Sequence, residues 1–152
     1  MYLTVHAAAG LAIARLSPHP VLTFVLALAS HLVLDAIPHG DEHLAPAHFA
    51  WAHKVRRLVG AAVVDALVLT GFLAIYLWVT PIDSGINLAA GVSGALLPDA
   101  VEGVYLITRA RGLESFDRFH VYIQSFAGSK IDWAHGMFVQ VMTFTALWLT
   151  LL

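Results

Sequence analysis

Apolar residues run through most of this chain in long stretches, and short stretches containing proline, glycine or charged residues separate them. A helix that crosses a membrane needs about 20 mostly apolar residues, because the hydrocarbon core is about 30 Å thick and an α-helix rises about 1.5 Å per residue. The first stretch is short for a span, and Pro98 predicts a kink or break in the fourth. The pattern predicts apolar helices over about Tyr2–Leu16, Pro20–Ile37, Lys54–Thr80, Ile86–Ala110 and Asp132–Leu152.

Two of the connections between these helices are polar. Residues 38–53 are rich in histidine and acidic side chains, and an interfacial helical turn is predicted around the sequence PAHFAWAH. Residues 110–130 form the least apolar segment, which predicts a helix lying at the membrane surface. No linker or low-complexity run divides the chain. We therefore predict an all-α integral membrane bundle of four to five transmembrane helices plus an interfacial helix, forming a single domain over residues 1–152.

Composition supports a membrane protein and excludes several other classes. Hydrophobic residues make up 59% of the chain and charged residues 12%, against about 45–50% and about 25% in soluble domains. There is no cysteine, so any metal must be held by histidine, aspartate or glutamate. The net charge of -2, without a basic stripe, argues against a nucleic-acid partner. No basic residue precedes the first apolar run, so we expect no cleaved signal peptide there, and membrane lipids are the expected partner.

The distribution of basic residues predicts an orientation. If the first four helices each cross the membrane, the N-terminus and the connections after the second and fourth helices lie on the same side. The positive-inside rule then places that side in the cytoplasm, with the C-terminus outside. Arg15 is the basic residue of the opposite side, and the cytoplasmic side collects Lys54, Arg56, Arg57, Arg109, Arg111, Arg118 and Lys130.

The same topology brings the ionisable residues of the apolar helices to one depth. Each such residue costs about 2.5–3.5 kcal/mol to insert, so each needs a partner or a function. Scattered structural residues would have no reason to share a depth, and the convergence therefore favours one site. The residues that fall near the cytoplasmic end are His6, His31, Asp35, Asp65, Asp99, Glu102, His120 and His135.

Spacing within the helices indicates metal chemistry. His31 and Asp35 are four residues apart, which stacks an imidazole and a carboxylate on one helix face. Asp99 and Glu102 are three apart and can both bind, or divide into a ligand and a base. Imidazole and carboxylate suit zinc, with manganese or iron as alternatives, and several carboxylates can bridge more than one ion. We expect one to three divalent ions.

Several of these side chains also have a simpler interpretation. His6 could be a packed residue that donates to a backbone carbonyl, and a His–Asp pair four apart can merely stabilise its helix. Asp99, after Pro98, could cap a broken helix. Asp65 is the hardest to explain in this way, because no basic residue lies within a helical turn of it. We expect the remaining polar residues after Pro38 to be solvated or interfacial: His39, Asp41, His43, His48 and His53.

Four phrases resemble a known family. These are VHAAAGLAI near the start, SHLVLDAIPHG at the end of the second helix, GALLPDAVEG in the fourth, and a histidine-bearing stretch before the last helix. In these four segments the chain resembles the small bacterial membrane-bound metal-dependent hydrolases. These inner-membrane-associated hydrolases are in turn distantly similar to zinc-dependent phospholipase C. The resemblance implies a bacterial inner-membrane location. It implies as metal ligands His6, His31, Asp35, Asp99 and His135, followed by Asp65 and His120.

These observations predict a metal-dependent phosphoesterase that acts on a lipid or lipid-linked phosphate at the cytoplasmic leaflet. Glu102 or Asp65 would accept the proton of the attacking water. A metal-ion or proton transporter that uses the same residues is an alternative. A structural membrane protein with a vestigial metal site is another, because the family phrase H-R-G-x-T-H-S is not found in this sequence.

Overall fold

A computed structural model describes residues 1–40, 44, 48–126 and 131–152. Asp41, His43 and Lys130, to which the sequence analysis assigned positions, lie outside these ranges. All regular structure in the described part of the chain is helical, with six α-helices and one short 3-10 helix. The all-α prediction is therefore confirmed.

The helices follow the predicted apolar stretches closely. α3 begins at Trp51 rather than at Lys54, so part of the predicted interfacial turn belongs to this helix. α4 continues through Pro98 without a break in its helical assignment. The elements in chain order are α1 Leu3–Leu16, α2 Pro20–Asp35, α3 Trp51–Val79, α4 Gly85–Thr108, η2 Arg111–Leu113, α5 Glu114–Gln124 and α6 Trp133–Leu151.

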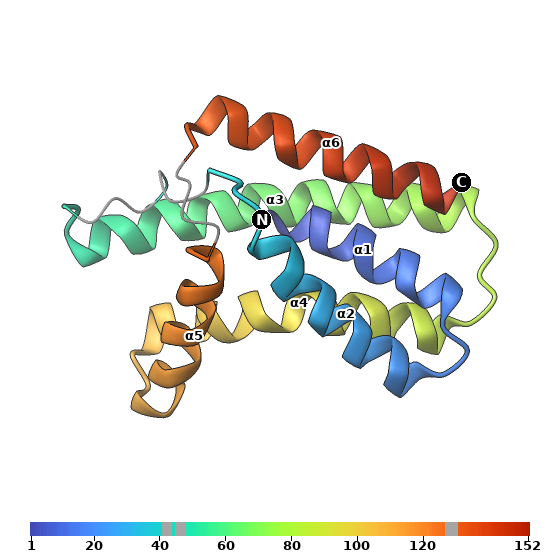
Figure 1. The fold of residues 1–152 in the computed structure, drawn as a ribbon, viewed down its shortest axis with the longest axis horizontal. Helices are drawn as coiled ribbons and strands as arrows, with labels where there is room; N and C mark the ends of the chain where they lie inside the picture. The colour runs from blue at the N-terminus through green and yellow to red at the C-terminus, as the bar shows by residue number, and fades with distance from the viewer. Residues whose placement is uncertain (41–43, 45–47, 127–130) are drawn as a thin grey trace.

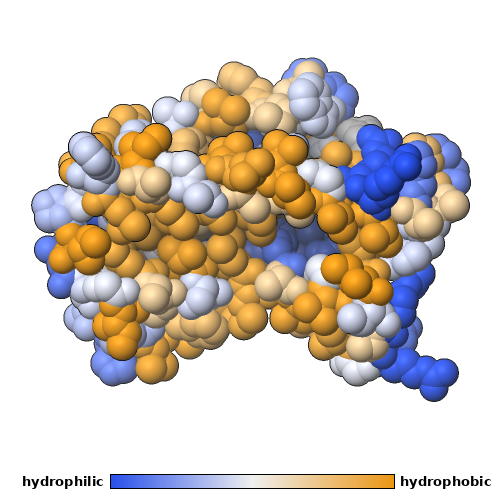
Figure 2. All heavy atoms as spheres, turned by 180° about the vertical axis from the view of Figure 1, so that it is seen from behind, coloured by the Kyte–Doolittle hydropathy of each residue, from blue (hydrophilic) through white to orange (hydrophobic). Residues whose placement is uncertain are grey.

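Three of these helices, α3, α4 and α6, are long and apolar enough to cross a membrane. Large apolar side chains such as Val64, Leu67 and Phe138 stand exposed on their surfaces, and hydrophobic residues cover most of the face seen in Figure 2. α1 has 14 residues, about 21 Å at 1.5 Å per residue, which is shorter than the hydrocarbon core. Most of α1 is buried, so the surrounding helices shield it. The chain thus has the helices of a membrane-associated bundle.

The helices α1, α2, α3, α4 and α6 lie side by side in alternating directions, with α1 in the middle (Figure 1). α1 packs against each of the other four. The N-terminus, the end of α2, the start of α3, the end of α4, α5 and the start of α6 all lie toward one end of the bundle, which we call the polar end. The turn between α3 and α4 and the C-terminus lie at the other. This arrangement agrees with the shared depth expected for the ionisable residues.

Small residues allow α1 to enter the middle of the bundle. A Cβ atom added to Gly10 of α1 would lie 2.4 Å from the carbonyl oxygen of Gly91 in α4, so the two backbones touch. Gly94 is in similarly close contact with the backbone of Phe24 in α2. Beyond the polar end, the core is apolar, and its buried members are Ala7, Ala8, Leu11, Leu69, Phe72, Tyr76 and Leu151.

Candidate metal centre

Two fully buried side chains of α2 form the base of the site. His31 and Asp35 lie one turn apart near the end of this helix, and His31 Nε2 is 3.2 Å from Asp35 Oδ2. The spacing of four residues predicted that both groups share one helix face, and the structure places them so. Because α2 ends at Asp35, this pair sits at the polar end of the bundle.

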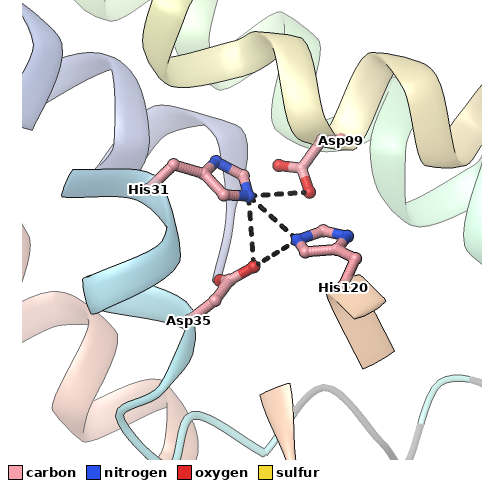
Figure 3. A group of neighbouring side chains, drawn as sticks. All are labelled: His31, Asp35, Asp99 and His120. Carbon is pink, nitrogen blue, oxygen red and sulfur yellow. Dashed lines mark hydrogen bonds and ion pairs between the residues drawn. The ribbon is translucent and has the colours of Figure 1, made fainter. Parts of the chain in front are cut away.

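Two further helices complete a cluster of four side chains around this pair (Figure 3). His120 of α5 places its Nε2 atom 3.0 Å from His31 Nε2 and 2.9 Å from Asp35 Oδ2. Asp99 of α4 places Oδ1 3.6 Å from His31 Nε2. One donor atom from each of the four residues lies within 4.8 Å of the other three. We refer to His31, Asp35, Asp99 and His120 as the His/Asp cluster, which could hold a metal ion.

Outward contacts of both imidazoles turn their Nε2 atoms toward the centre. His31 Nδ1 lies 2.7 Å from the carbonyl oxygen of Ala95. A carbonyl only accepts, so Nδ1 carries the hydrogen and Nε2 keeps its lone pair. His120 Nδ1 lies 2.7 Å from Glu102 Oε2, which favours the same tautomer. Carbonyl and carboxylate partners behind the ring are characteristic of histidines that bind metals.

The electrostatics of the cluster favour a cation. Burial of His120 lowers its pKa, but hydrogen bonds to Asp35 and Glu102 and the charges of both carboxylates outweigh burial and raise the pKa to about 10. Without an ion, His120 is thus protonated and carries a positive charge between these acidic groups, and a divalent ion would take the place of its Nε2 proton. Asp99 Oδ2 is buried without a hydrogen-bond partner in the described residues. Two imidazoles and two carboxylates form a donor set that suits zinc, manganese or iron, and a divalent ion would balance both carboxylates.

His6 lies beside the cluster without being one of its four members. Its Nε2 atom is 3.1 Å from Asp35 Oδ1, on the other side of the carboxylate from His120. Its ring stacks on that of His31 with centroids 3.9 Å apart. The N-terminal ammonium of Met1 also contacts Asp35 Oδ1. The carboxylate of Asp35 therefore joins the His/Asp cluster to the start of α1.

Asp65, expected as a ligand or proton acceptor, contacts the N-terminus of α1 instead. Its carboxylate accepts hydrogen bonds from the backbone N–H groups of Leu3 and Thr4 and, at 2.6 Å, from the Thr4 hydroxyl. Asp65 thus satisfies donors that have no partner within their own helix. The partner of Asp65 is therefore the first turn of another helix, and it is a set of uncharged donors rather than a basic residue.

His135 is not brought to the cluster either. Its side chain is 77% exposed, and its Nδ1 atom lies 2.6 Å from Asp132 Oδ2. Asp132 also accepts a hydrogen bond from the backbone N–H of His135 and thereby caps α6. These hydrogen bonds, the backbone one first, lower the pKa of Asp132. The three-residue spacing of Asp132 and His135 is that of a helix cap.

Other residues of the polar end differ from expectation or were not singled out. His39, which we expected to be solvated, is buried, and its Nδ1 atom lies 2.7 Å from the carbonyl oxygen of Ile37. Gln140 of α6 is 2% exposed. It accepts a hydrogen bond from the Tyr2 N–H at 2.8 Å and donates one to the His39 carbonyl at 3.0 Å. A lone amide in a strongly apolar helix was the signal that could have identified it. His48 and His53 are exposed, as predicted.

Comparisons of the chain with protein-family models, with curated proteins and with solved structures found no match.

Proposed function

We propose that this chain is a membrane-bound, divalent-metal-dependent hydrolase, a phosphoesterase that acts on a lipid or lipid-linked phosphate. The observation that carries the proposal is the buried His/Asp cluster, in which the Nε2 atoms of His31 and His120 face the carboxylate of Asp35. A His–Asp pair that only stabilised α2 would need no side chains from other helices, whereas here α2, α4 and α5 all contribute a side chain to one point. The convergence supports a site that binds something small and positively charged.

The donor set supports a single-ion core with zinc as the first choice and manganese or iron as alternatives. A divalent ion held there would supply activation of water and stabilisation of phosphate charge. Asp35 and Asp99 provide the negative charge that attracts the ion. The Ala95 carbonyl and Glu102 keep a hydrogen on each Nδ1 atom, so that both rings would bind the ion through Nε2.

Glu102 is the carboxylate we assign to proton transfer. It is 28% exposed on its side chain and lies one helical turn from Asp99, which is 20% exposed. Glu102 is therefore an acidic group beside the cluster that the attacking water molecule could reach. Its contact with His120 Nδ1 holds this carboxylate beside the cluster.

A pathway through the membrane is less well supported than a site that opens at one end. A transporter needs polar groups along its whole path. Past the cluster, the core between α1, α3 and α6 consists of apolar side chains, among them Leu11, Phe72 and Leu151. The basic residues of the polar end support the cytoplasmic leaflet of a bacterial inner membrane as the place of action.

Metal content and phosphate release test the proposal together. We expect the purified protein to retain a stoichiometric divalent ion that chelation removes, and to release phosphate from phosphatidic acid or an isoprenyl phosphate only when metal-loaded. Asp35→Asn should lose both properties, because it halves the negative charge of the cluster. Asp99→Asn, at a partly exposed position, should lose them without endangering folding.

Asp132→Asn is the matched control, since it makes the same chemical change at an exposed carboxylate outside the cluster. It should keep metal and turnover. Wild-type turnover in Asp99→Asn, or a wild-type protein that binds no divalent ion, would refute the proposed function.

A further inference from the structure

The His/Asp cluster is exposed on one side. The side chains of His31, Asp35 and His120 have no exposed surface, whereas that of Asp99 is 20% exposed. Glu102, one turn further along α4, is 28% exposed. Both belong to the same helix. Any molecule that reaches the cluster must therefore approach along the flank of α4.

This flank lies inside the hydrophobic length of the helix. Asp99 precedes the last residue of α4, Thr108, by a distance of about 14 Å along the helix axis at 1.5 Å per residue. α4 is one of the three helices long and apolar enough to cross a membrane. Leu97 and Val104, on the opposite face of the helix from Asp99, are exposed apolar side chains at about the same depth. The exposed side of the cluster therefore lies within the apolar length of α4.

The position on α4 next to Asp99 on the same helix face is a glycine, and no side chain covers the cluster there. Gly103 lies four residues after Asp99 and shares its helix face. A Cβ atom added to Gly103 would meet no atom within 4 Å. On the face seen in Figure 2, the hydrophobic surface is hollowed at one place, and hydrophilic residues form the floor of the hollow. A hollow of this kind matches half-buried acidic groups within an apolar surface.

The helix α3 reaches the end of α4 at the polar end of the bundle. α3 and α4 both pack against α1, and their backbones are not closely packed against each other in the described residues. At the polar end, however, the two helices are joined by side chains. The guanidinium carbon of Arg109, directly after α4, lies 3.3 Å from the ring centroid of Trp51, the first residue of α3. This cation–π contact closes the gap at the water side.

We infer that a membrane lipid brings its phosphate to the His/Asp cluster sideways, through an opening between α3 and α4 beside Asp99 and Gly103. This inference rests on the proposed function, since it names the route by which the substrate enters the same site. The acyl chains remain against the apolar flanks of α3 and α4 while the phosphate enters. The contact between Arg109 and Trp51 holds the two helices together at the surface end. Soluble phosphate esters have no comparable path through the hydrocarbon.

Paramagnetic relaxation measures this approach without requiring turnover. The full chain is placed in nanodiscs of equal parts phosphatidylglycerol and phosphatidylcholine, loaded with Mn²⁺ as the probe, and the ³¹P relaxation of the lipid phosphates is recorded. We expect a strong Mn²⁺-dependent enhancement for lipid phosphate and a much weaker one for glycerol phosphate added in water. Gly103→Trp should lose most of the lipid enhancement while Mn²⁺ affinity stays unchanged.

Gly71→Trp is the matched control, because Gly71 is also a helical glycine with open space around its Cβ position, on α3 and away from the cluster. It should keep the lipid enhancement. Equal enhancement in Gly103→Trp and wild type, or a stronger effect on glycerol phosphate than on lipid, would overturn the route while leaving the metal site intact. Failure of the wild type to bind Mn²⁺ would refute the metal site, and this inference with it.

Discussion

Replacement of Asp65 by alanine tests whether this buried carboxylate supports the fold or the chemistry. Asp65 accepts hydrogen bonds from the Leu3 and Thr4 N–H groups and from the Thr4 hydroxyl. Loss of a helix N-cap costs about 0.5–2 kcal/mol, and a buried donor left unsatisfied costs about 1–3 kcal/mol. Because the two terms overlap, we expect Asp65→Ala to lower the free energy of unfolding by about 2–4 kcal/mol.

The assay is thermal unfolding in detergent micelles, followed by circular dichroism, with metal content measured on the same sample. Asp65→Asn keeps an acceptor oxygen and should recover most of the stability. Asp83→Ala, at an exposed aspartate in the turn after α3, should leave the unfolding temperature unchanged. If Asp65→Ala unfolded like the wild type but lost its bound metal, the capping role would be wrong and the predicted ligand role would be restored.

Two further variants test the surroundings of the cluster and the packing of α1. Glu102→Gln removes the charge behind His120 Nδ1. We expect metal affinity, measured by titration calorimetry, to fall about tenfold, which is the low end of the usual 10–100-fold loss for such partners. Unchanged affinity would contradict the role of Glu102. Gly10→Ala would press a Cβ atom against the backbone of Gly91, so we expect a loss of about 1–3 kcal/mol or more in unfolding free energy. Gly60→Ala, where the added Cβ meets open space, should be neutral or slightly stabilising, and equal effects of the two glycine changes would show that the helix contact is not tight.

The sequence predicted those features of the site that follow from the period of the α-helix. His31 and Asp35 share a face because four residues make about one turn, and this holds for any packing of the bundle. The shared depth of Asp99, Glu102 and His120 followed from counting spans. Which of these residues touch depends on how each helix is rotated about its axis, and periodicity does not contain that information.

Asp65 and His135 show why the remaining assignments were not available from the sequence. A carboxylate inside an apolar helix indicates that a partner exists, but it does not say whether the partner is an ion or the first turn of another helix. Likewise, an aspartate three residues before a histidine fits both a ligand pair and a helix cap. Only the position of the neighbouring helix distinguishes the two.

The sequence by itself determined that the chain is all-α, that its apolar stretches form helices, and that most ionisable residues of these helices lie toward one end. Hydrophobic length and helical period are local properties, and they survive any arrangement of the helices. The tertiary structure decided that His120 rather than His135 faces His31, that Asp65 supports α1, and that the cluster opens along α4. These outcomes depend on how the helices pack, as where the close contact of Gly10 with Gly91 brings α1 against α4, and packing is not a local property of the sequence.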